Sequence, residues 1–187
     1  MNRQQFVFAF VMVACCAWQT ASAQLVGGSP FDAAPVGKTV QGIMDCGSNY
    51  EGNEAYNIKV TVLQFARGDM GVKAALGMEE LPPPAEGTEY LVVNVRFDYK
   101  ARGRPGNCVH TVRPEHFNVL SSNGFKYSMA ALALPLPGMS GEIKSGESME
   151  GWVLYEVIIQ DFEPLMSFSV GEGSVAHGGE LWFKLYE

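Results

Sequence analysis

Alternation of apolar and polar residues is the dominant pattern along this chain. The clearest run covers 88–100, where every second residue from Leu91 is apolar and the residues between them are polar from Asn94 onward. Its apolar face holds Leu91, Val93, Val95, Phe97 and Tyr99, and its polar face Asn94, Arg96, Asp98 and Lys100. A period of two is typical of a strand with one buried face, and a solvated face favours antiparallel neighbours. We therefore predict a long central strand in an antiparallel sheet.

Shorter runs of the same kind predict six more strands. They lie at 56–65, 117–121, 125–129, 152–159, 166–170 and 181–185. In the first run the apolar phase shifts by one residue after Val62, which predicts a bulge or a change of partner. Asn123-Gly124 is a strong hairpin signal, because both residues accept positive φ at low cost. The 152–159 run is almost continuously apolar and predicts a core strand covered on both faces.

Seven short strands separated by turn signals predict the fold class. It is all-β, an immunoglobulin-like antiparallel β-sandwich of about seven strands. Only 72–81 has a pattern that could form a short helix. The chain has 187 residues, of which 47% are hydrophobic, enough for one domain with a substantial core. We place this domain at 37–187, after a flexible lead-in at 24–36.

The pattern of residues 1–23 is typical of a cleaved secretory signal peptide. A positive Arg3 precedes an apolar run, and Ala21-Ser22-Ala23 provides a small-x-small cleavage site. The apolar run is shorter than the roughly 20 residues that a membrane-spanning helix needs. In the alternative, Met12-Val13-Ala14-Cys15 resembles a bacterial lipobox, and Cys15 carries a lipid anchor. Both alternatives place the protein outside the cytoplasm, secreted or periplasmic in the first.

Removal of the signal segment leaves two cysteines, Cys46 and Cys108. Exported proteins fold in oxidising compartments, so a structural disulfide between them is expected. Redox-active cysteines usually stand two residues apart, and metal-binding cysteines come in close groups. Neither spacing occurs here. We therefore predict a Cys46–Cys108 disulfide with a structural role.

Two segments between the predicted strands are unusually long. One covers 68–87 and combines Glu79-Glu80 with three consecutive prolines, and the other covers 130–141 and is rich in leucine and proline. Loops longer than about 12–15 residues are often functional. We predict an interaction loop made by Met129, Leu132, Leu134, Leu136 and Met139. These side chains either form an exposed contact patch or fold over one end of the sandwich.

Charge and motifs disfavour most chemical functions. The formal net charge of −7 repels nucleic acids and anionic lipids. A serine hydrolase needs Gly-x-Ser-x-Gly, whereas 138–141 has a different spacing. His110 and His116 stand six residues apart, which is not a recognised zinc-ligand spacing. We interpret the carboxylates as solvated surface, and we predict neither catalysis nor a cofactor.

Methionine provides an alternative function. Met129, Met139 and Met149 recur every ten residues, and thioethers together with imidazoles suit Cu(I). Methionine is also an ordinary filler of hydrophobic cores. Convergence of these three side chains with a histidine would favour a periplasmic protein that binds copper or a small ligand.

Several motifs together resemble a known family. They are Glu89-Tyr90-Leu91-Val92-Val93-Asn94-Val95, Phe117-x-Val119-Leu120 with Ser122-Asn123-Gly124 and Tyr127, Gly146-Glu147-x-x-x-Gly151-Trp152-Val153, and a short strand with Leu165 and Phe168. Over about 37–187 this order resembles the bacterial telokin-like family of secreted domains of unknown function, akin in fold to the immunoprotective extracellular antigen family. The resemblance implies an immunoglobulin-like sandwich outside the cytoplasm and carries no shared catalytic residues. The acidic segment with three prolines departs from the family pattern.

These observations favour one function class. We predict a non-catalytic protein-interaction module of the cell envelope or extracellular space, with no transmembrane segment in the mature chain. Its partner is expected to be an envelope or extracellular protein.

Overall fold

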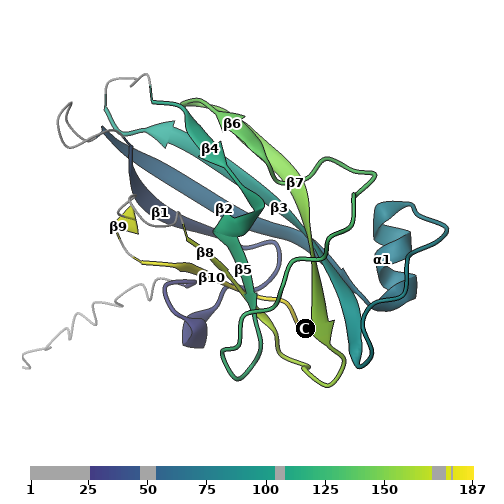
Figure 1. The fold of residues 1–187 in the computed structure, drawn as a ribbon. Helices are drawn as coiled ribbons and strands as arrows, with labels where there is room; N and C mark the ends of the chain where they lie inside the picture. Colours follow the sequence, from purple (N-terminus) through teal and green to yellow (C-terminus); the bar gives the residue numbers. More distant parts are fainter. Residues whose placement is uncertain (1–25, 47–53, 104–107, 170–175, 178) are drawn as a thin grey trace, which may run out of the picture.

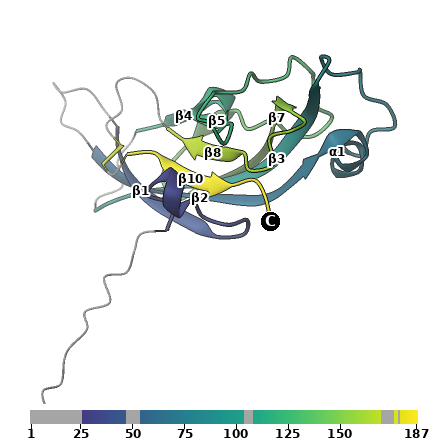
Figure 2. The same ribbon diagram turned by 90° about the horizontal axis from the view of Figure 1, so that it is seen from below.

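A computed structural model describes residues 26–46, 54–103, 108–169, 176–177 and 179–187. The predicted fold class is confirmed, because the described chain forms an antiparallel β-sandwich with one α-helix at its side (Figures 1 and 2). The predicted signal peptide and lipobox lie outside the described residues.

The large sheet has five strands in the order β7–β3–β2–β1–β9. Its members are β1 (Thr39–Cys46), β2 (Glu54–Arg67), β3 (Thr88–Ala101), β7 (Ser148–Ile158) and β9 (Ala176–His177). A three-stranded sheet, β10–β8–β5, and a two-stranded pair, β4–β6, provide the facing side chains of the core. They comprise β4 (His110–Val112), β5 (Phe117–Leu120), β6 (Gly141–Ile143), β8 (Leu165–Phe168) and β10 (Leu181–Lys184). Short 3-10 helices are η1 (Pro30–Asp32) and η2 (Pro114–His116).

Most of the predicted strands are present. Among the described strands, the seven with at least four residues are β1, β2, β3, β5, β7, β8 and β10. Six of these match predicted runs, whereas β1 was not predicted. The run 125–129 is not a strand, because after the Asn123-Gly124 turn the chain leaves β5 and follows the edge of β7. Only isolated bridges, Leu120 with Lys126 and Met129 with Tyr155, remain on that path.

The predicted phase shift in β2 is a β-bulge. The β2–β3 register moves between Val62 and Gln64, which leaves Leu63 without a ladder partner. Phe65 then packs against the main core, whereas Leu63 turns outward with 36% of its surface exposed. Because of the extra residue, the odd-numbered Phe65 points into the core, as the even-numbered residues do before the bulge.

The helix lies earlier than the sequence pattern indicated. α1 covers Gly68–Leu76 rather than 72–81, because Gly77 adopts φ +67 and ends the helix with a left-handed cap. Val72 and Leu76 stand one turn apart and point toward the sheet, where both are buried. Figures 1 and 2 both show α1 beside the β2–β3 end of the large sheet.

A second, smaller core lies on the outer face of β3 and β7. Its buried members are Val72, Leu76, Tyr90, Val92, Trp152 and Leu154. The segment 130–136 covers this core in an extended conformation and packs Leu132, Leu134 and Leu136 against it. β7 is therefore buried on both faces through its apolar stretch, as the sequence predicted.

The surroundings of Gly151 explain why the Gly-Trp-Val motif begins with glycine. The segment 137–139 crosses β7 at this residue, with Met139 N donating to the Trp152 carbonyl at 3.1 Å and Trp152 N donating to the Pro137 carbonyl at 2.9 Å. A Cβ at position 151 would lie 2.7 Å from the backbone of Gly138 and Met139. Only glycine leaves room for this crossing.

The described part of the predicted lead-in, residues 26–36, pairs with the sandwich. Ala34 pairs with β10 at Phe183, accepting from Lys184 N at 2.8 Å and donating to the Trp182 carbonyl at 2.8 Å. Ala33 and Ala34 are buried. This segment satisfies the backbone groups along the β10 edge, which would otherwise be open to another strand.

The two cysteines that follow the predicted signal peptide are joined in the structure. A disulfide links Cys46 at the end of β1 to Cys108, which stands just before β4, with their Cα atoms 6.2 Å apart. It thereby ties the large sheet to the β4–β6 pair.

Candidate functional site

The predicted interaction loop lies against the sheet. Met139 is completely buried in the main core, and Leu132, Leu134 and Leu136 are half-buried in the second core. Met129 is the most exposed of the five, at 38%. Of the two alternatives that the sequence left open, the loop follows the one in which its side chains cover the sandwich, and it does not form an exposed contact patch.

Two methionines of the copper hypothesis, Met129 and Met139, contact different parts of β7, and the third, Met149, belongs to β7 and packs against the main core. Met129 pairs with Tyr155, whereas Met139 lies beside Gly151, four residues away along the strand. At the rise of a β-strand this separation is about 13 Å. The described residues hold no group of three or more histidines, cysteines or carboxylates suited to a metal ion. The arrangement gives the copper hypothesis no support.

His110 and His116 form a stacked pair inside an aromatic cluster. Their ring centroids are 5.6 Å apart, and His110 also lies 5.8 Å from the rings of Phe97 and of Tyr99. His110 Nε2 is buried without a hydrogen-bond partner. Burial, and to a smaller extent the neighbouring His116, lowers the pKa of His110 to about 4, and burial also lowers the pKa of His116. Both rings are therefore neutral at pH 7 and act as aromatic packing.

The first unexplained surface feature is an apolar hollow of about 520 Å³ on the outer side of the three-stranded sheet. Leu120 of β5 and Leu165 of β8 are paired across the sheet, and Trp182 of β10 lies beside them. Tyr186 continues this floor beyond β10. All four side chains are half-buried, so the floor is apolar and open to solvent.

Three exposed phenylalanines surround this end of the molecule. Phe31 of η1 lines the hollow and is 95% exposed, Phe125 follows the lining residue Gly124 and is 75% exposed, and Phe162 precedes the lining residue Glu163 and is 77% exposed. They come from η1 and from the turns 121–126 and 159–164, which lie on the lower side of Figure 1 together with the C-terminus. We call the hollow and these three phenylalanines the aromatic end.

The two turns of the aromatic end are fixed by Asp161. Its side chain is 7% exposed and accepts from Tyr127 Oη at 2.7 Å and from Ser122 N at 3.3 Å. Burial and the Asp161 carboxylate raise the pKa of Tyr127 to about 12, so the phenol remains a donor. The Arg67 guanidinium also donates to the Asp161 carbonyl and to the Ile158 carbonyl. These contacts join the bases of the two turns to the end of β2.

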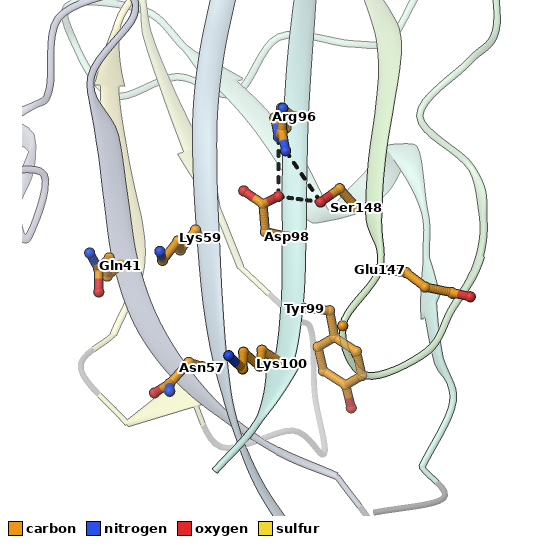
Figure 3. Close-up of a pocket in the computed structure, with 10 residues that line it drawn as sticks. Gln41, Asn57, Lys59, Arg96, Asp98, Tyr99, Lys100, Glu147 and Ser148 are labelled. Carbon is orange, nitrogen blue, oxygen red and sulfur yellow. Dashed lines mark hydrogen bonds and ion pairs between the residues drawn. The ribbon is translucent and has the colours of Figure 1, made fainter. Parts of the chain in front are cut away.

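The second feature is a polar hollow of about 600 Å³ on the outer face of the large sheet. Figure 3 shows its side chains on β1, β2 and β3, with Lys59 and Lys100 on neighbouring strands. Lys59 is paired with Gln41 on one side and Asp98 on the other, and Lys100 is paired with Asn57. Arg96 donates to Asp98, and Ser148 also donates to that carboxylate.

Neither hollow could be located from the sequence alone. The alternation in 88–100 identified Arg96, Asp98 and Lys100 as surface residues, but register alone places Lys59 beside them. The phenylalanines stand 94 and 37 residues apart in the chain, and their apolar character alone does not distinguish them from core residues. The exposed turn positions of Phe125, beside Asn123-Gly124, and of Phe162, before Pro164, were the only available signals.

Comparison with known proteins adds the following. No family model matches the sequence, and no curated protein matches it. A candidate lipoprotein of Bacillus subtilis is similar in structure at 16% identity, with a TM-score of 0.48, over 68% of this chain and 35% of its own. The secreted protein MPT63 of Mycobacterium tuberculosis is similar at 12% identity, with a TM-score of 0.47, over 81% of this chain and 95% of its own.

This chain thus spans about a third of the first of these proteins and nearly all of the second. At such identities and TM-scores, neither structure assigns a family or a function, and the telokin-like resemblance stays a prediction. Among the described helices, none has the length and apolar character needed to cross a bilayer.

Proposed function

We propose that this protein is an exported, non-catalytic recognition domain that binds a protein of the cell envelope or extracellular space through its aromatic end. The observation that carries this proposal is the exposure of Phe31, which lines the apolar hollow, and of Phe125 and Phe162, which adjoin its lining residues Gly124 and Glu163. Contiguous exposed apolar surface on a soluble protein often marks an interaction site, and aromatic residues are enriched in protein–protein interfaces.

The local structure supports recognition rather than accidental exposure. Asp161 of the turn 159–164 is buried and accepts from Ser122 N of the other turn and from Tyr127 Oη, so the turns that carry Phe125 and Phe162 are held in one arrangement before a partner arrives. Preorganisation reduces the entropy lost on binding and raises affinity. The Phe31 element is likewise held, since its backbone neighbours pair with β10.

A protein partner fits the aromatic end better than a lipid surface does. Glu163 lines the hollow, and the chain as a whole is acidic with a net charge of −7. Both features repel anionic headgroups. Ser122 and Asn123 add polar groups at the rim of an apolar floor, the combination of apolar centre and polar rim that protein interfaces have.

Export is supported by two independent features. The N-terminal pattern is that of a secretory signal peptide, and the Cys46–Cys108 disulfide suits an oxidising compartment. Binding through loops at one end of a β-sandwich needs no catalytic group, in agreement with the absence of a recognisable catalytic motif in the sequence.

The test is site-specific photo-crosslinking in the native cell envelope and medium. Benzoylphenylalanine replaces Phe31, Phe125 or Phe162 in the full-length chain, one position at a time. It also replaces Met70 of α1 as a control, because Met70 is 84% exposed but belongs to a different surface. We expect one and the same crosslinked protein from the three phenylalanine positions and none of it from Met70.

A second arm measures the dependence on the side chains. The triple variant Phe31→Ser, Phe125→Ser, Phe162→Ser should lose capture of the crosslinked partner, whereas Met70→Ser should retain it. Equal capture by the triple variant, or crosslinking to lipid alone, would overturn the proposal.

A further inference from the structure

The outer face of the large sheet changes character along β3. Tyr90 and Val92 face the second core and are buried under α1 and the segment 130–136. From Asn94 onward, the same face carries Arg96, Asp98 and Lys100, and the polar hollow opens there. Half of this sheet face is covered by the chain itself, and the other half is left open.

The open half carries two lysines, and the register places one carboxylate, Asp98, opposite Lys59. Lys59 and Lys100 are exposed, and neither forms an ion pair with any residue that the structure describes. The register pairs Lys59 with Asp98 and Asn57 with Lys100, so the two lysines are diagonal neighbours on adjacent strands. Diagonal neighbours of this kind are about 7–8 Å apart at the backbone, within reach of one ligand.

Both acidic side chains of the hollow, Asp98 and Glu147, accept hydrogen bonds, Asp98 through Oδ1 alone. The Asp98 carboxylate accepts from Arg96 Nε at 3.1 Å and from the Ser148 hydroxyl. Glu147 accepts from Lys144 N at 2.7 Å, and Figure 3 shows its carboxylate directed away from the two lysines. The remaining polar groups near the lysines are the side-chain amides of Gln41 and Asn57, which both donate and accept hydrogen bonds.

We infer that the polar hollow binds an anionic glycan, with Lys59 and Lys100 holding its acidic groups and Gln41 and Asn57 its hydroxyls. The hollow, of about 600 Å³, is open to solvent along the sheet face. Lysines that form no ion pair with the described residues favour a negatively charged ligand, and side-chain amides donate to and accept from the hydroxyl groups of a glycan. This site is separate from the aromatic end and does not rest on the function proposed for it.

The acidic groups of such a glycan are carboxylates or phosphates, and two probes distinguish them. Isothermal titration calorimetry at low salt measures binding of the mature protein to polygalacturonate, to poly(glycerol phosphate) and to neutral dextran. We expect binding to one or both polyanions, weaker binding as salt is added, and no binding to dextran. The preferred polyanion identifies the acidic group.

Matched variants locate the site. Lys59→Gln with Lys100→Gln should weaken binding at least about tenfold, because two charge-assisted contacts are lost. Lys38→Gln with Lys126→Gln removes the same charge from exposed positions outside the hollow and should change binding less than about twofold. Phe31→Ser should leave glycan binding unchanged, which keeps this result independent of the aromatic end.

Three outcomes would overturn the inference. They are no binding to either polyanion by the unmodified protein, equal binding to dextran, and equal weakening by the two pairs of lysine substitutions. Circular dichroism of each variant establishes that the sandwich is intact before its binding is compared.

Discussion

Lowering the pH from 7 to 5 should destabilise this protein through His110. The ring is 9% exposed, its Nε2 has no hydrogen-bond partner, and its neighbours include Phe97, Tyr99 and His116. The charged groups that act on the neighbouring His116 are Arg113 and Glu115. Burial and the second imidazole lower the pKa of His110 from 6.5 to about 4. Protonation of the folded state is therefore unfavourable.

The sign and size of the effect follow from linkage. The unfolded chain binds a proton below about pH 6.5, whereas the folded protein binds it only near pH 4. Stability from the neutral ring is thus complete above pH 6.5 and is lost as the pH falls toward 4. For these pKa values the free energy of unfolding falls by about 2 kcal/mol between pH 7 and pH 5, and by about 3 kcal/mol below pH 4.

The assay is urea unfolding at pH 7 and pH 5 for the unmodified protein and for His110→Phe. Phenylalanine suits the aromatic surroundings and cannot titrate, so the variant should lose about 2 kcal/mol less than the unmodified protein over this interval. Carboxylates and His116 contribute to both proteins and largely cancel in the difference. Equal losses in the two proteins would show that His110 is not held neutral by burial, and the reasoning would fail.

Two further predictions concern the backbone crossing and the disulfide. Gly151→Ala should lower the free energy of unfolding by about 2–4 kcal/mol in urea unfolding, because the new methyl group displaces the segment 137–139 and its two hydrogen bonds. Gly71→Ala in α1 is the control and should raise the free energy of unfolding by up to about 1 kcal/mol, since its Cβ meets only Ala66 at 3.8 Å. If the control lost as much stability as Gly151→Ala, the steric argument would be contradicted. Reduction of Cys46–Cys108 should cost up to about 4 kcal/mol, because it releases a loop with a sequence separation of 62. An unfolding midpoint unchanged by reductant would refute this.

The strands of the sandwich could be predicted because their alternation records which face is buried. β3 and the bulge after Val62 follow directly from this pattern. β1 could not be found in the same way, because Gly42 interrupts its alternation and its burial is uneven. The pairing that makes β1 a strand comes from β2, whose paired residues run from Glu54 opposite Cys46 to Thr61 opposite Thr39.

The run 125–129 shows the opposite failure. Its residues have strand-like composition, and the turn before them is real, since Gly124 has φ +82 and Ser121 N donates to the Phe125 carbonyl at 2.8 Å. The chain nevertheless leaves β5, because Tyr155 of β7 offers an edge for Met129 to pair with. Competition between two edges is a tertiary effect that a local pattern does not contain.

The location of the candidate sites depends on what covers the sheets. The segments 68–87 and 130–141 are long and differ in composition from their surroundings, which suggested an interaction role. In the structure they instead provide α1 and Leu132, Leu134 and Leu136, which cover the apolar half of the outer face. That cover accounts for the apolar residues Tyr90 and Val92 on a face that is otherwise polar. A segment that protects apolar surface has little left to offer a partner. If the proposed recognition functions hold, binding is therefore expected at the uncovered surfaces. These are the polar half of the same face and the phenylalanine-bearing turns that no other part of the described chain packs over.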